Sequence, residues 1–386
     1  MRRGELHLTY CTNVHPGEGL DAVDAVLTRD VAAVKRLVCP DAPFGLGLRL
    51  GHRAAATLAT DPRAHDALAA RLSELGLYVF TLNGFPYGDF AAATVKAAVY
   101  QPSWLDDERV AYTVRLAEAL VTLPGPTERT ISTVAGGFGP DTATFEAHRA
   151  IAANLGRVAR SLAALADRSG VSVRLCLEPE PWTTLETTPD AVRFFAEHLS
   201  PLGAVARDHL GLCYDCCHQA VHFEEPGEAL GALADAGIAV GKVQVSSALH
   251  LARPDDAAAR AALLAFAEPR YLHQTVARTA DGRLLRALDL PELSSPDADW
   301  RAAEAWRTHF HVPIWWDGDG GLGTTRGDWQ RAVRVAVDRG LCRHLEIETY
   351  TWHVLPAAER AAMGAADLHL GVAREFAALI AALGAP

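Results

Sequence analysis

The sequence predicts an α/β protein that folds as a single closed (β/α)8 barrel, and two patterns lead to this prediction. Eight short apolar runs alternate with stretches in which apolar residues recur about every 3.6 positions. Strand-then-helix units repeated in this way are typical of a parallel barrel. A chain of 386 residues is long enough, because one α/β barrel routinely exceeds roughly 250 residues.

The apolar runs give the eight expected strands, and the helical patterns lie between them. Strands are expected over residues 5–10, 44–50, 77–82, 130–135, 171–178, 209–215, 239–247 and 344–349. Helices are expected over 19–38, 62–76, 106–121, 145–170, 189–198, 227–236, 328–339 and 356–383. An open doubly wound sheet would also fit this alternation. However, "CTNVHPGEG" after the first strand lacks the Gly-x-Gly-x-x-Gly turn of dinucleotide-binding folds.

The interval between the seventh and eighth strands is unusually long. Residues 248–327 contain one helical pattern, over 256–267, followed by "YLHQTV", "HFHVPIWW" and "DGDGGLG". Long connections of this kind often serve as lids over a site. We therefore expect one barrel domain over 1–386, with 248–327 as an insertion that forms a lid at the catalytic mouth.

The composition argues against several classes of protein. The net charge is −11 and no Lys/Arg-rich run is present, which argues against nucleic acid and anionic membranes as partners. Seven cysteines in so long a chain do not predict a disulfide framework. No apolar run is long enough for a signal peptide or a membrane span, so we expect a cytoplasmic protein.

Acidic, amide and imidazole groups follow the expected strands at the end that forms the barrel mouth. Carboxylate oxygen and neutral imidazole suit Zn²⁺, Mn²⁺, Co²⁺ and Fe²⁺. Taken singly, each residue has an ordinary structural reading, and the coincidence at several strand ends favours a site. The residues at these positions are His15, Asn83, Glu178, Asp215, His218, Gln244 and Glu348.

The last strand, in "HLEIETYTWH", carries two glutamates that alternate and therefore share one face. Glu348 is nearer the strand end and is the expected ligand. Glu346 lies one layer deeper, where it could orient another ligand or be purely structural. For Glu180, in "CLEPEP", a functional role and an ordinary structural or surface role carry equal weight.

The insertion offers further candidates. His309 and His311 alternate in "HFHVP" and would bind metal or substrate if their strand closes over the mouth; an ordinary surface strand fits equally well. His273 has the same two readings. Trp352, with its aromatic neighbours, would form a pocket wall or core packing. Lys242 on the seventh strand would neutralise a carboxylate or bind a phosphate, and the clustered Cys213, Cys216 and Cys217 are interpreted as small packing residues.

These residues together resemble the xylose-isomerase-like TIM-barrel superfamily, which includes sugar isomerases, ketose epimerases and endonuclease IV-type phosphodiesterases. "LTYCTNVHPGE", "TLNGFPYGDF", "VKAAVYQPSW", "CLEPEP", "YDCCHQAV", "FHVPIWW" and "LEIETYTW" resemble, more narrowly, the EboE-type metabolite-traffic proteins. The motifs run from residue 8 to residue 352 and cover most of the chain.

The resemblance implies a divalent-metal barrel, with Zn, Mn or Co, encoded in an operon for metabolite biosynthesis and traffic that would also supply partner proteins. It places the metal on Glu178, Asp215, Gln244 and Glu348, with His218 nearby. The superfamily usually has His at the seventh-strand position, where this chain has Gln244, and His311 could supply that imidazole. A His expected after the Phe of "FPYGDF" is replaced by Ala91, which weakens a trinuclear site more than a mononuclear one.

Three functions stay open at this stage. The first is an isomerase or epimerase of a sugar, cyclitol or polyol phosphate, with Glu178, Glu348 and His218 as catalytic groups. In it His15, Asn83, Lys242, His273, His309 and Trp352 would bind substrate. The second is a metal-dependent phosphoester hydrolase. The third is a non-catalytic metabolite carrier or assembly protein with a degraded metal site.

Overall fold

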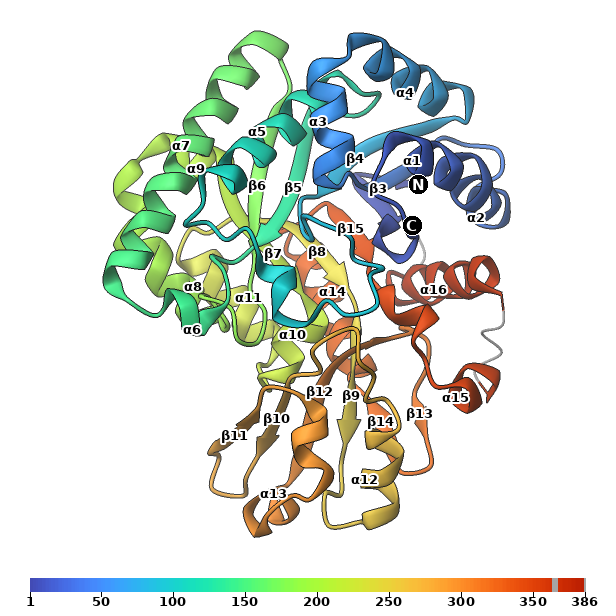
Figure 1. Cartoon of the computed structure of the whole chain (residues 1–386), viewed down its shortest axis with the longest axis vertical. Helices are drawn as coiled ribbons and strands as arrows, with labels where there is room; N and C mark the ends of the chain where they lie inside the picture. Colours follow the sequence, from blue (N-terminus) through green and yellow to red (C-terminus); the bar gives the residue numbers. More distant parts are fainter. Residues whose placement is uncertain (363–366, 385–386) are drawn as a thin grey trace.

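The computed structural model describes residues 1–362 and 367–384, and its centre is a barrel of eight parallel strands (Figure 1). The strand order is β2-β15-β8-β7-β6-β5-β4-β3, and a bridge between Cys11 and Gly47 brings β3 back beside β2. All eight expected strands are confirmed, at β2 Leu6–Tyr10, β3 Phe44–Arg49, β4 Leu77–Asn83, β5 Glu128–Val134, β6 Ser172–Glu178, β7 Leu210–Asp215, β8 Val240–Val245 and β15 His344–Ile347. A short strand, β1 Arg2–Arg3, pairs antiparallel with β2.

Helices surround the barrel at the places where the 3.6-residue pattern predicts them. The expected ones are α1 Leu20–Ala25 and α2 Ala32–Val38, α4 Pro62–Glu74, α5 Asp107–Thr122, α7 Phe145–Ser169, α8 Thr188–Phe194, α11 Pro226–Asp235, α12 Ala257–Leu264, α14 Arg326–Asp338, α15 Ala357–Ala362 and α16 Leu368–Ala382. Part of the expected helix 356–383, residues 363–366, lies outside the described residues. Gly170 ends α7 with φ at 71°, the left-handed conformation in which glycine commonly caps a helix.

Short helices escaped the sequence patterns because they offer too few turns for a periodicity to show. They are α3 His52–Thr60, α6 Gly139–Thr142, α9 Ala204–His209, α10 Cys216–Val221 and α13 Ala298–Ala302. The helix α10 matters for the site, since Asp215 at the end of β7 caps it by accepting a hydrogen bond from the His218 backbone nitrogen at 2.8 Å.

The insertion between β8 and β15 folds as a second, six-stranded antiparallel sheet in the order β11-β10-β12-β9-β14-β13. Its strands are β9 Ser247–Leu251, β10 Thr275–Arg278, β11 Leu284–Ala287, β12 Ala305–Val312, β13 Gly318–Asp319 and β14 Leu322–Thr324. Figure 1 shows this sheet below the barrel, with β12 and β9 rising towards it. The segment is therefore regularly folded through much of its length.

A polar layer crosses the interior of the barrel. Parallel pairing sets Glu346 beside both Thr9 and Gln244, and Gln244 beside Asp215, so these side chains follow one another around the barrel. Gly47 leaves the space that Glu346 needs, because a Cβ at residue 47 would lie 1.4 Å from Glu346 Oε1. No helix in the described ranges is long and apolar enough to cross a membrane.

Candidate metal centre

Three carboxylates from different strands meet at the mouth of the barrel. Glu178 ends β6, Asp215 ends β7 and Glu348 follows β15. Their oxygen atoms all lie within 4.8 Å of one another, and the three residues are buried. The structure thus brings together the acids that the sequence places far apart, which is what a single bound cation requires.

Burial and mutual repulsion shift the pKa values of these acids upwards. Burial, followed by repulsion from Glu348 and Asp215, raises the pKa of Glu178 well above its ordinary value. Burial raises the pKa of Asp215 to about 7 and that of Glu348 to about 7. Carboxylates crowded in this way are unstable as anions, and a divalent cation would offset their charge.

Two imidazoles stand next to the acids, one from each part of the chain. His218 comes from α10, and its Nδ1 lies 3.0 Å from the Pro179 carbonyl oxygen. His311 comes from β12 of the insertion, and its Nδ1 lies 2.7 Å from the Glu348 carbonyl oxygen. Since a carbonyl can only accept, both Nδ1 atoms carry the proton and both Nε2 atoms carry a lone pair.

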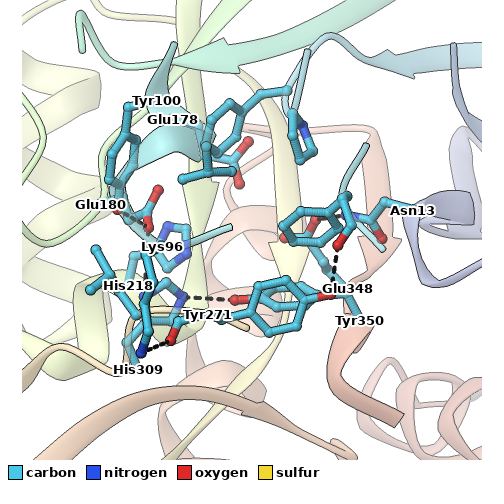
Figure 2. A pocket seen from close by; sticks show the side chains of 15 residues that line it. Asn13, Lys96, Tyr100, Glu178, Glu180, His218, Tyr271, His309, Glu348 and Tyr350 are labelled. Atoms are coloured by element: carbon cyan, nitrogen blue, oxygen red, sulfur yellow. Dashed lines mark hydrogen bonds and ion pairs between the residues drawn. The ribbon is translucent and has the colours of Figure 1, made fainter. Parts of the chain in front are cut away.

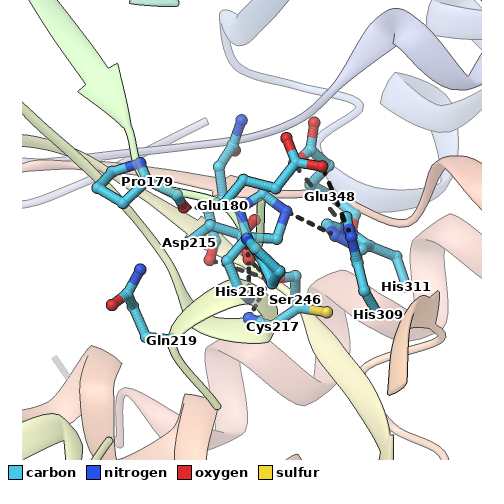
Figure 3. Close-up of polar contacts among 12 residues, drawn as sticks. Pro179, Glu180, Asp215, Cys217, His218, Gln219, Ser246, His309, His311 and Glu348 are labelled. Atoms are coloured by element: carbon cyan, nitrogen blue, oxygen red, sulfur yellow. Dashed lines mark hydrogen bonds and ion pairs between the residues drawn. The ribbon is translucent and has the colours of Figure 1, made fainter. Parts of the chain in front are cut away.

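Those two Nε2 atoms face each other at 3.4 Å (Figure 3). Two lone pairs at this separation repel unless a cation or a proton lies near them. Burial and the neighbouring imidazole lower the pKa of His218 well below its ordinary value, which disfavours a proton. Imidazoles that donate Nδ1–H to a backbone carbonyl are typical metal ligands. Asp215, His218 and His311 also have ligand atoms within 4.8 Å of one another, so Asp215 belongs to both groups.

Buried polar atoms without a partner support a ligand at this place. Asp215 Oδ2, Gln244 Oε1 and Asn13 Oδ1 form no hydrogen bond within the described part of the chain. Such atoms are costly to bury. Asn13 also donates to Glu348 Oε1 at 2.9 Å, which holds that carboxylate in place. The donor set of carboxylate, amide oxygen and imidazole fits a divalent transition metal.

A layer below the acids is occupied by Lys242, which points into the barrel from β8. Its ammonium pairs with Glu346, and both side chains are fully buried. It also donates to Asn83 Oδ1 at 2.8 Å, and Asn83 in turn donates to Glu346 Oε1 at 3.0 Å. Burial lowers the pKa of Lys242, but the Glu346 carboxylate outweighs this effect and the pKa rises. Of the two expected roles of Lys242, the structure shows the neutralisation of a carboxylate. Asn83, expected to bind substrate, lies beside Lys242 beneath the mouth.

Gln244 connects this layer to the acids above it. Its Nε2 donates to Asn83 Oδ1 at 3.2 Å, and this leaves Oε1 as the end without a partner. The amide is therefore oriented by Asn83, and its oxygen is the only atom it offers to a ligand.

Three other expected site residues lie elsewhere. His15 bonds the Tyr10 hydroxyl through Nε2 at 3.0 Å, and its Nδ1 lies 3.8 Å from Asp30. His273 is held on both sides, by the His309 carbonyl at 3.2 Å and by Glu268 at 3.0 Å. Trp352 packs on α16, where a Cβ at Gly371 would meet its ring at 2.4 Å. None of the three is among the residues that line the pocket described next.

A pocket opens above the acids, and Figure 2 shows its lining (Asn13, Phe85, Pro86, Phe90, Lys96, Val99, Tyr100, Glu178, Glu180, His218, Tyr271, Leu272, His309, Glu348 and Tyr350). Glu178, His218 and Glu348 lie on its floor side, so the candidate ligands can be reached from it. His309 is the expected substrate-binding residue that the structure does bring to the pocket. Cys217 also has its sulfur within 4.8 Å of ligand atoms of His309 and His311.

Several lining residues were missed by the sequence reasoning. Glu180 carried a signal, since it lies two positions after Glu178 in an extended segment. Asn13 lies two residues before His15, in a motif that was singled out for His15. Tyr100 lies in "VKAAVYQPSW", a motif that was quoted only for the family resemblance. Tyr271 carried no signal, because it comes from an irregular segment whose path the sequence does not indicate.

Comparisons with known proteins agree with this architecture. The family model described as xylose isomerase-like TIM barrel matches residues 46–267, more than half of the chain. A solved xylose isomerase-like TIM barrel protein from Mycobacterium smegmatis, in complex with magnesium, is 12% identical, with 98% of each chain covered and a TM-score of 0.53.

Two further solved structures are more distant in shape. The probable 3-DHS dehydratase AsbF of petrobactin synthesis from Bacillus anthracis is 12% identical over 97% of this chain and 98% of that one, with a TM-score of 0.48. An AP endonuclease of family 2 from Brucella melitensis is 19% identical over 55% of this chain and 72% of that one, with a TM-score of 0.36. No match is found among curated proteins.

Proposed function

Because the chain belongs to the xylose isomerase-like TIM barrel family, we propose that it is a divalent-metal-dependent enzyme that isomerises or epimerises a sugar or another polyol. The observation that carries this proposal is the meeting of Glu178, Asp215 and Glu348 within 4.8 Å beneath an accessible pocket. Glu178, Asp215, Glu348 and the oxygen of Gln244 would hold the cation. When bound, it would polarise a substrate carbonyl and lower the barrier to removing the neighbouring proton.

The two glutamates differ in how firmly the protein holds them. Glu348 is fixed by Asn13, whereas the Glu178 carboxylate forms no hydrogen bond with the described residues. We assign Glu178 as the base that takes a proton from the carbon next to the carbonyl, while the electron pair moves onto the carbonyl oxygen. In an isomerisation, Glu178 gives the proton to the former carbonyl carbon while the neighbouring hydroxyl passes its proton to the former carbonyl oxygen. In an epimerisation, Glu348 would give a proton to the opposite face of the carbon that Glu178 deprotonated.

The insertion takes part in this site as well as covering it. His309 and His311 both come from β12, and Tyr271 and Leu272 precede β10. We therefore propose that residues 248–327 form the lid of the pocket and contribute His311 as a ligand.

The test is solvent exchange. Metal-loaded protein is incubated in deuterated water with aldoses, ketoses and inososes, and incorporation at carbon is followed by mass spectrometry. We expect exchange with at least one compound, lost in Glu178→Gln and kept in Glu224→Gln, a partly buried carboxylate that bonds Thr188 away from the pocket. Full metal content without exchange across the panel would overturn the proposal.

A phosphoester hydrolase is the second candidate, and the pair His218–His311 favours it. With Asp215 shared between the two groups, the chain offers two adjacent metal positions, and paired metals are typical of phosphoester hydrolysis. The distinguishing measurement is release of 4-nitrophenol from bis(4-nitrophenyl) phosphate, together with two metals per chain.

The finer assignments rest on sequence motifs alone. We propose an EboE-type metabolite-traffic protein, a cytoplasmic location and partner proteins from the same operon. Affinity purification of the tagged chain from its own host, followed by identification of co-purified proteins, tests the partners.

A further inference from the structure

We infer that the substrate is an uncharged polyol with an apolar flank, and that Glu180 recognises it by accepting a hydrogen bond from a substrate hydroxyl at the pocket wall. This inference rests on the proposed function and narrows its substrate class. An isomerase or epimerase could also act on phosphorylated sugars, and the inference excludes them. Three features of the pocket wall carry it.

The first feature is an aromatic wall whose hydroxyls are already used. Tyr350 packs edge to face against both Phe90 and Tyr271, which are tilted relative to each other, and the ring centroids are 4.7–5.1 Å apart. Tyr271 donates to the Phe90 carbonyl at 3.0 Å, and the Tyr350 hydroxyl meets His309 Nε2 at 3.3 Å. The wall therefore presents carbon to a ligand, which suits an apolar flank.

The second feature is that the positive charge at the pocket is neutralised within the protein. Lys96 is the one lysine or arginine in the described lining. Its ammonium pairs with Asp289 and donates to the Tyr271 carbonyl at 2.7 Å. Its backbone φ of 42° is unusual for a residue other than glycine, and its backbone nitrogen donates to the Arg270 carbonyl at 2.9 Å. Lys96 is thus fixed to the insertion and is not free to bind a phosphate.

Both ring nitrogens of the His309 imidazole already have partners. Its Nδ1 lies 2.8 Å from Gln274 Oε1, to which it donates, so Nε2 is the acceptor of the Tyr350 proton. A phosphate group is recognised by cationic side chains or convergent N–H groups, and this wall offers it neither.

The third feature is the fixed direction of the hydrogen bonds that end on Glu180. Gln274 Nε2 donates to the Tyr100 hydroxyl at 2.9 Å, and that hydroxyl donates to Glu180 Oε1 at 2.7 Å. The order of donors fixes Glu180 Oε1 as the acceptor at the end of the series. A carboxylate has about four acceptor sites, and Tyr100 uses one of them. The remaining ones are suited to a substrate hydroxyl and unfavourable for a phosphate oxygen.

The experiment compares three probes by calorimetry on the metal-loaded full chain at pH 8.5. Phenyl β-D-glucopyranoside is uncharged with an apolar flank, methyl β-D-glucopyranoside lacks the flank, and phenyl β-D-glucopyranoside 6-phosphate carries a charge. We expect the phenyl glucoside to bind about tenfold more tightly than either of the others. A hydrogen bond to a charged group stabilises by about 1.5–3 kcal/mol, so Glu180→Gln should weaken the phenyl glucoside roughly 10–100-fold.

Two controls and two contrary results make the test decisive. Glu224→Gln should bind the probes as the wild type does. In Glu180→Gln, the difference in affinity between the phenyl glucoside and its 6-phosphate should become smaller. Equal or tighter binding of the 6-phosphate, or no binding of the phenyl glucoside, would overturn this inference while the metal content stays stoichiometric. A chain that retains no metal would instead overturn the proposed function, so the two failures are distinguishable.

Discussion

His218 and His311 face each other with Nε2 atoms 3.4 Å apart, and the Nδ1–H of each donates a hydrogen bond to a backbone carbonyl. One imidazole belongs to the barrel and the other to the insertion, so the insertion supplies half of the pair. We expect His311→Ala to remove one ligand of the proposed cation and so to weaken metal binding, because only the carboxylates and His218 would remain to hold the ion. At a limiting metal concentration, metal content by mass spectrometry should fall, whereas His250→Gln, a control on β9, should not change it. An unchanged metal content in His311→Ala would show that the pair does not bind an ion.

Asp215 belongs to both donor groups. Replacement of this aspartate by asparagine should therefore weaken metal binding more than Glu348→Gln does, because Glu348 belongs to one of the two groups only. The loss for Asp215→Asn should be at least the 10–100-fold that even an indirect contact to a metal can cost. Titration with Zn²⁺ against a competing chromophoric chelator measures it. Full retention of metal by Asp215→Asn would contradict the shared role.

The ion pair between Lys242 and Glu346 predicts a difference between single and double substitutions. Lys242→Met leaves the Glu346 carboxylate buried without its partner, which should cost roughly 3–5 kcal/mol of unfolding free energy. The double variant Lys242→Met with Glu346→Gln removes both charges and should recover part of that loss. Denaturant unfolding of the metal-free protein compares the two. A double variant less stable than the single one would argue against this account.

The buried carboxyl of Glu375, which is not one of the candidate metal ligands, should make the free energy of unfolding depend on pH. Its carboxyl accepts from the Thr349 hydroxyl and from the Ile314 backbone nitrogen, and burial raises its pKa to about 8. The unfolded chain releases this proton near pH 4.5, so the group stabilises the folded state fully below that pH and the stabilisation is lost as the pH rises through about 8. Glu375→Gln should therefore unfold with a shallower loss of stability between pH 5 and pH 9 than the wild type, as followed by urea denaturation at each pH. Parallel pH profiles for the two proteins would contradict this prediction.

The strands and the acids at their ends could be predicted because both depend on local sequence. An apolar run ending in Glu178, Asp215 or Glu348 indicates a buried strand with a carboxylate at the mouth, and the barrel geometry then brings the ends together. The alternation in "HFHVP" could not decide between a metal-binding role and an ordinary surface strand for His311. The contact between His311 and His218 depends on where β12 meets the barrel, which the local sequence does not indicate.

Contacts made by irregular segments could not be predicted in the same way. Tyr100 reaches Glu180, and Gln274 reaches Tyr100, only because two loops far apart in the chain cross above the mouth. His15 illustrates the reverse error. It follows the first strand as the other candidates follow theirs, but a turn carries it to Tyr10 and Asp30 instead.

Gly47 is as necessary to the buried ion pair of Lys242 and Glu346 as the two charged residues are. Its missing side chain is the room in which the Glu346 carboxyl sits, and even alanine would collide with it. Any such replacement would push Glu346 towards the amides above and shift the oxygen that Gln244 offers. A single methyl group at Gly47, on the second strand of the barrel, would thus change the affinity of the site for its metal, although this residue has no reactive group. A mutational scan for altered metal preference should begin at that position.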